Sequence, residues 1–109
     1  IFLKIGRNYY IYGRVQGVGF RYHTLHWGKK HGLYGYVYNR YDGSVNIKAF
    51  GTLEQIQQLE DWLKAGGPVG AKIEYYKSEE CHVEKEVVDF HIRHSFFVAC
   101  FAGPFGKRP

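Results

Sequence analysis

The stretch of the sequence best suited to chemistry is a nine-residue segment, residues 13–21, which reads GRVQGVGFR. A strand that runs into a glycine-rich loop and then into a helix can turn successive backbone N–H groups toward one point, where the helix N-terminus adds positive charge. Arg21 falls in the first turn of that helix, where its planar guanidinium can hold two phosphoryl oxygens. The segment therefore predicts a site for a phosphate-sized anion, although the spacing alone also fits a plain turn followed by a solvated arginine.

The segment matches neither of the two common nucleotide-binding loops. A Walker loop needs a Gly-Lys-Ser/Thr ending, and a dinucleotide fingerprint needs three glycines at a different spacing. Asn39 is the second candidate, at the end of the next expected strand. Its neutral amide can donate to a water molecule and accept from it, and so can orient the water. Asn is also common in turns at strand ends, so both readings of this position stay open.

Hydrophobic periodicity predicts the elements that position these residues. Strands are expected at residues 8–15, 34–39, 44–50, 71–77 and 86–93. Helices are expected at residues 21–31 and from a Thr52/Gln55 capping box to the Gly66-Gly67-Pro68 stop. Gly28 costs its helix about 1 kcal/mol relative to alanine, which indicates close backbone contact with a strand. In the last strand, Val88, Phe90 and Ile92 are expected to face inward.

The resulting order β-α-β-β-α-β-β predicts an α+β fold of the ferredoxin-like, split β-α-β type. We expect a two-layer sandwich in which two helices cover one face of an antiparallel sheet of about five strands. The loop after the first strand and the end of the second can then converge at one edge. Because this fold carries many unrelated functions, it does not itself name one.

Composition narrows the class of protein further. The 109 residues fit one domain, and we expect a domain at 1–94 followed by a C-terminal extension of unknown role at 95–109. The longest apolar run, residues 96–102, is far shorter than the roughly 20 residues of a membrane helix, so no membrane partner is expected. The sequence has two cysteines, which cannot form a framework of disulfides, so we expect a cytoplasmic protein. We also expect it to be a monomer. A net charge of +5 favours anionic ligands without choosing among them.

Residues 13–21, Asn39 and the Asp42-Gly43-Ser44-Val45 segment together resemble the signatures of the acylphosphatase family. The similarity runs from about Tyr10 to Arg93. It implies a small enzyme that hydrolyses the carboxyl–phosphate bond of acyl phosphates to a carboxylate and inorganic phosphate, with no metal and no cofactor. It also implies that Arg21 and Asn39 are catalytic and that Asn39 positions the attacking water. The implied phosphate-binding loop comprises Gln16, Gly17, Val18, Gly19, Phe20 and Arg21.

The chemistry of an acyl phosphate suits so sparse a site. The leaving group is a carboxylate whose conjugate acid has a pKa of about 4–5, so its departure needs no general acid. Charge on the phosphoryl oxygens must be stabilised, which amides and a guanidinium can do. The water must be held in line, and the substrate's own phosphate can take its proton. A catalytic carboxylate or histidine is therefore not required.

Three other readings remain open on the sequence. Tyr10, Tyr12, Tyr36 and Tyr38 can point to the open face of the sheet, as in a module that binds RNA or single-stranded nucleic acid. Residues 44–50 lack the pattern of such modules, so a nucleic-acid partner is not expected. The chain can also be a domain of a larger maturation enzyme. Zinc is a third reading, from the residues Cys81, His82, His91, His94 and Cys100, but their spacing is not that of a structural zinc site, and we expect solvated histidines.

Overall fold

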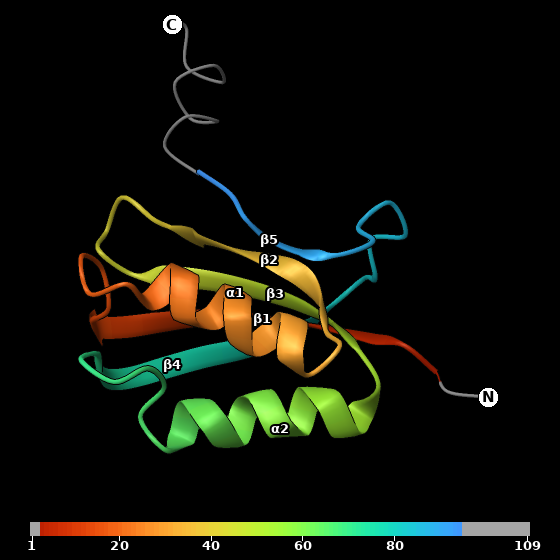
Figure 1. The fold of residues 1–109 in the computed structure, drawn as a ribbon, viewed down its shortest axis with the longest axis horizontal. Coiled ribbons are helices and arrows are strands. Elements are labelled where there is room, and N and C mark those ends of the chain that lie inside the picture. The colour runs from red at the N-terminus through yellow and green to blue at the C-terminus, as the bar shows by residue number, and fades with distance from the viewer. Residues whose placement is uncertain (1–2, 95–109) are drawn as a thin grey trace, which may run out of the picture.

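Seven elements follow one another in the order that the periodicity predicts (Figure 1). The computed structural model describes residues 3–94, so the extension expected at 95–109 lies outside the described residues. The strands are β1 (Ile5–Arg14), β2 (Tyr34–Asn39), β3 (Val45–Gly51), β4 (Lys72–Cys81) and β5 (Phe90–Ile92). The helices are α1 (Phe20–Lys30) and α2 (Leu53–Lys64). No helix in the described part of the chain is long and apolar enough to cross a membrane.

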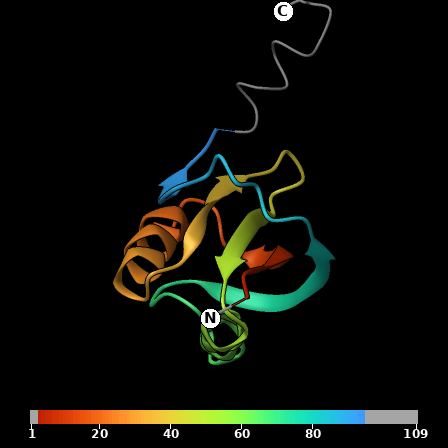
Figure 2. The same ribbon diagram turned by 90° about the vertical axis from the view of Figure 1, so that its right-hand side faces the viewer.

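The five strands form one sheet in the order β4-β1-β3-β2-β5. Both helices lie on the same side of it, which confirms the ferredoxin-like two-layer sandwich (Figure 2). Three strand pairings are antiparallel, but β5 runs parallel to β2. The sheet is therefore mixed, whereas an antiparallel sheet was predicted from the sequence. The chain leaves β4 at one edge of the sheet and crosses to the opposite edge before it forms β5, and this crossover sets the parallel direction.

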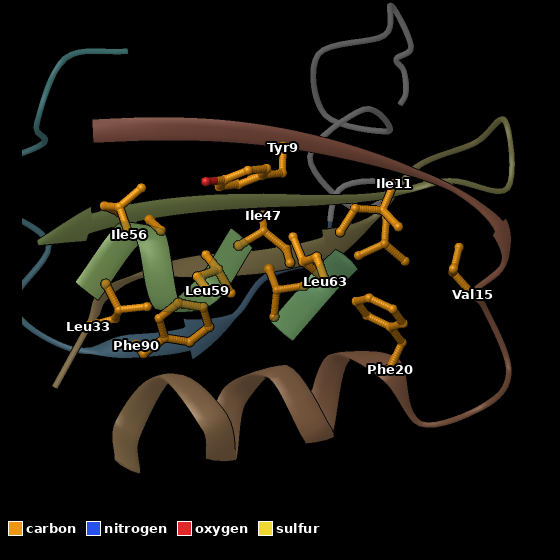
Figure 3. Packing of buried hydrophobic residues seen from close by; sticks show 13 residues of the cluster. Tyr9, Ile11, Val15, Phe20, Leu33, Ile47, Ile56, Leu59, Leu63 and Phe90 are labelled. Carbon is orange, nitrogen blue, oxygen red and sulfur yellow. The ribbon is translucent and has the colours of Figure 1, made fainter. Parts of the chain in front are cut away.

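The core lies between the sheet and the two helices (Figure 3). Alternate residues of β1, such as Tyr9 and Ile11, are fully buried against the apolar side of α2, which carries Leu59 and Leu63. Burying a large apolar side chain contributes about 1.5–3 kcal/mol, so this layer supplies most of the stability. Phe20, the first residue of α1, packs into the end of the core and thereby fixes where the helix begins.

Local signals set the ends of the helices. Thr52 and Gln55 form the predicted capping box at the start of α2, with each side chain accepting from the other's backbone N–H. Helix α1 ends in a Schellman motif, in which the N–H of Leu33 donates to the carbonyl of Gly28 at 2.9 Å. Gly32 has a φ of 73°, which is the left-handed conformation that this motif requires.

Gly28 packs directly against β5, as its position in the sequence predicts. A Cβ built on Gly28 would lie 2.8 Å from the ring carbons of Phe90, closer than side chains pack. The ring of Phe90 is buried and occupies the space that any larger residue of α1 would need. The absent side chain at Gly28 therefore sets the distance between α1 and the edge strand.

The prediction for the last strand was wrong in one respect. Val88 is 73% exposed instead of facing inward, and Val87 is buried in its place. The N–H of Val87 donates to the carbonyl of Glu84 at 3.0 Å, which closes a turn where the sequence pattern predicts extended chain. Strand β5 consequently forms only at Phe90–Ile92, where it can pair with β2.

Candidate active site

The loop between β1 and α1 owes its shape to two glycines. Gly17 has a φ of 75° and Gly19 a φ of 76°, both in the left-handed region that side chains disfavour. Gly19 is the N-cap residue of α1, and no side chain caps the helix there. The first N–H groups of α1 thus meet no capping side chain, and the partial positive charge of the helix end stays unopposed at the loop.

A hollow of about 120 Å³ lies at the start of α1. Its lining residues are Val15, Gly17, Gly19, Phe20, Arg21, Tyr22 and Asn39. The structure thus brings Arg21 and Asn39 to one small cavity, together with three residues of the predicted loop. The loop and the turn after Asn39 lie at the same end of the sheet, on the left in Figure 1. The catalytic roles of Arg21 and Asn39 stay predictions.

The guanidinium of Arg21 is available for a ligand. Arg21 lines the hollow and is partly buried, and its guanidinium forms no hydrogen bond or ion pair with another side chain among residues 3–94. The first turn of α1 contains no acidic residue, so no carboxylate of that turn competes for this cation. A partly buried cation beside the positive end of a helix attracts an anion strongly, because both charges act on the same volume.

Asn39 is held by the tight turn that joins β2 to β3. The N–H of Arg40 donates to the carbonyl of Ser44 at 2.8 Å, and Gly43 takes a φ of 90°. Ser44 donates to the carboxylate of Asp42 through both its hydroxyl and its N–H, and these hydrogen bonds lower the pKa of Asp42. The turn therefore keeps the end of β2 in a fixed place beside the hollow.

Two residues of the predicted loop do not line the hollow. The carboxamide of Gln16 turns to the β2–β3 turn, where it donates to the carbonyl of Arg40 at 2.7 Å and to that of Ser44 at 2.9 Å. Val18 packs against the main core cluster. The side chains of Gln16 and Val18 accordingly have structural contacts, while their backbone groups remain part of the loop.

Tyr22 lines the hollow but was not among the predicted site residues. Its side chain is 62% exposed at the rim, directly after Arg21 in the first turn of α1. Its place next to Arg21 was the one signal in the sequence that pointed to it. The ring of Tyr22 therefore belongs to the lining of the hollow and is also accessible to solvent.

A larger groove of about 520 Å³ lies between the start of β1, the end of β4 and α2. Its charged lining mixes cations such as Lys4 and Arg7 with Glu60 and Glu80. Glu60 is engaged within the fold, accepting from the hydroxyls of Tyr9 and Tyr76. The first turn of α2 borders this groove at Leu53, but the side chain of Thr52 caps that helix end, and the groove has no glycine loop. The smaller hollow is therefore the better candidate site.

The histidines considered for zinc do not converge. His91 uses both ring nitrogens locally: Nδ1 lies 2.8 Å from the Asp89 carboxylate, and Nε2 accepts from Nε of Arg93 at 3.0 Å. Residues 3–94 contain no group of three or more His, Cys, Asp or Glu side chains placed to hold a metal ion. Cys100, one of the five residues considered as zinc ligands, lies outside the described residues.

The fold and the hollow define a class of small α/β sandwich with a glycine-rich loop between its first strand and first helix. Residues 7–92 match the family model for acylphosphatase, and the chain belongs to the acylphosphatase family. A curated acylphosphatase from Photorhabdus laumondii is 52% identical over 92 residues, which is 84% of this chain and 99% of that protein.

Solved structures agree with this assignment. The crystal structure of acylphosphatase from Bacillus subtilis has a TM-score of 0.74 and 34% sequence identity, covering 82% of this chain and 98% of that one. Full-length HypF in its phosphate- and nucleotide-bound form has a TM-score of 0.78 and 31% identity, covering 85% of this chain but only 12% of that one. The same fold therefore serves both as a small enzyme and as part of a much larger protein.

Proposed function

We propose that this protein hydrolyses the carboxyl–phosphate bond of acyl phosphates at the hollow between the glycine loop and Asn39. One observation supports the proposal: Arg21 and three other loop residues line a single cavity of about 120 Å³ together with Asn39, which is far from them in the sequence. Membership of the acylphosphatase family supports the same activity. The chain is thus a hydrolase that acts on a small anionic substrate.

The reaction proceeds by in-line displacement at phosphorus. The loop amides and Arg21 bind the phosphoryl oxygens and stabilise the charge that they carry in the transition state. Asn39 holds a water molecule opposite the leaving group, so that its oxygen attacks phosphorus as the bond to the carboxylate oxygen breaks. The water's proton passes to a phosphoryl oxygen of the substrate. The products are inorganic phosphate and a carboxylate, which leaves without protonation.

The nucleic-acid alternative gains little from the open face of the sheet. The tyrosine rings there are already partnered: the guanidinium of Arg93 lies 3.6 Å from the ring centre of Tyr36, and that of Arg40 lies 4.8 Å from Tyr10. Tyr12 stacks on Tyr75 at 4.7 Å. Bases would have to displace these cations to stack on the same rings, so we do not propose this function.

The direct test is hydrolysis of benzoyl phosphate in the presence of EDTA. We expect rapid release of benzoate and phosphate that EDTA does not diminish, since the site residues supply the charge stabilisation themselves. Phenyl phosphate is the matched control, because its phenolate leaving group has a conjugate acid with a pKa of about 10 and needs an acid that this site lacks. Folded protein that does not cleave benzoyl phosphate, or that loses its activity with EDTA, would contradict the proposal.

We also propose that the enzyme is a cytoplasmic monomer. Its size is that of a single domain, which supports a monomer. Its two cysteines cannot form a framework of disulfides, which favours a reducing compartment. The hollow is lined within one chain, so the proposed reaction needs no second copy.

A further inference from the structure

We infer that Gln16 is a positioning residue that sets the place of Asn39 relative to the phosphate-binding loop; this inference rests on the proposed function. Gln16 belongs to the loop by sequence, yet its carboxamide does not line the hollow. Instead it crosses to the β2–β3 turn and donates both of its N–H bonds, to the carbonyls of Arg40 at 2.7 Å and Ser44 at 2.9 Å.

These two carbonyls bracket the turn that follows Asn39. The backbone of Arg40 comes directly after Asn39, and Ser44 comes directly before the β3 residue that pairs with Asn39. The same two residues are already joined by a hydrogen bond from the N–H of Arg40 to the carbonyl of Ser44. Gln16 therefore links the loop by hydrogen bonds to both ends of the β2–β3 turn.

The link matters because the two halves of the site come from different elements. The phosphoryl group is to be held by the loop and Arg21, whereas the water is to be held by Asn39 at the end of β2. In-line attack depends on the distance between them, and a misplacement of about 1 Å can cost about 100-fold in rate. The two side-chain hydrogen bonds of Gln16 join these two segments.

Gln55 offers a matched control at the other end of the molecule. Its carboxamide also donates to two backbone carbonyls, those of His31 at 3.1 Å and Gly32 at 3.4 Å, but it lies at the start of α2. Replacing either glutamine by methionine keeps a side chain of similar length and removes the amide group. Both variants thus lose two donations to backbone carbonyls, and only Gln16→Met loses them beside the site. Gln55→Met also loses the capping-box hydrogen bond from the N–H of Thr52, which lowers stability.

The experiment measures kcat and the inhibition constant of inorganic phosphate for both variants. We expect Gln16→Met to lower kcat about 10- to 100-fold with little change in phosphate affinity, because the loop still binds the anion while the water is misplaced. Gln55→Met should melt at a lower temperature but keep its kcat. In an Asn39→Ala background, Gln16→Met should lower kcat little further, because the residue through which it acts is gone.

Each alternative result has a clear meaning. Equal kcat losses in the two glutamine variants, additive losses with Asn39→Ala, or phosphate affinity that falls as much as kcat would overturn the inference. If the unmodified protein cleaves no acyl phosphate, the proposed function fails instead. The inference is then tested by NMR: the Asn39 side-chain amide signal should shift in Gln16→Met and not in Gln55→Met, and an unshifted signal would overturn it. Should Gln16→Met not fold, Gln16→Leu, which is also uncharged and has no donors, takes its place.

Discussion

Arg21→Ala is expected to lower kcat/KM by about 1,000-fold or more and to weaken inhibition by inorganic phosphate as well. The guanidinium lines the hollow and has no side-chain partner among the described residues, so its charge is available to the phosphoryl group in the ground state and in the transition state alike. Loss of one preorganised donor to a developing anion typically costs about 100- to 1,000-fold, and a bidentate cation supplies two such donors. Steady-state kinetics with benzoyl phosphate, with phosphate as inhibitor, measure both effects.

Two further variants show whether geometry or charge is responsible. Arg21→Lys should restore little activity, since an ammonium supplies a point charge without the planar pair of donors. Arg14→Ala removes the same charge from an exposed position at the end of β1, outside the hollow, and should leave turnover nearly unchanged. Normal turnover by Arg21→Ala would show that the loop is not the active site.

Asn39→Ala is expected to lower kcat by about 100-fold or more while phosphate inhibits it as well as it inhibits the unmodified enzyme. The amide is proposed to hold the water and not the anion, so its loss removes an interaction that matters only for attack. The measurement is kcat together with the inhibition constant of phosphate, with thermal unfolding to verify that the β2–β3 turn survives.

Asn39→Asp provides the contrast for this prediction. It keeps the size of the side chain but adds a negative charge at the hollow, so it should weaken phosphate binding, which the alanine variant should not. If Asn39→Ala instead abolished phosphate binding and kept its turnover, Asn39 would be part of the anion site and the assigned role would be wrong.

Local signals in the sequence were sufficient for most of the fold. The bounds of β2 were predicted as Tyr34–Asn39, and the Thr52/Gln55 box marks the start of α2 as expected. Both depend on residues close together in the chain. The end of β4 and the start of β5 were misplaced, because β4 extends to Cys81 by pairing with β1, and the turn before Val87 interrupts the alternation. Strand pairings between residues far apart in the chain cannot be recognised from the local sequence pattern.

The site shows the same division. The glycine loop, Arg21 and Asn39 could be identified from residue types and from the family resemblance, and the structure places all three around one hollow. The contact of Gln16 with the β2–β3 turn could not be predicted from the sequence. An amide in a loop can bind a ligand, water or a backbone carbonyl, and which of these it binds depends on the folded structure. Tyr22 was missed because its place next to Arg21, the one signal in the sequence, does not distinguish a residue that lines a hollow from a solvated one.

Binding of inorganic phosphate, followed by two-dimensional NMR of the ¹⁵N-labelled protein, is the sharpest test of whether the hollow beside α1 is the phosphate site. Phosphate is a product of the proposed reaction and carries the group that the loop must hold. We expect saturable shifts of the backbone amides of Gly17, Gly19, Phe20 and Arg21 and of the Asn39 side-chain amide, with the residues of the larger groove unaffected. Shifts centred on Lys4 and Arg7 in that groove, or no saturable shift at the loop, would contradict it.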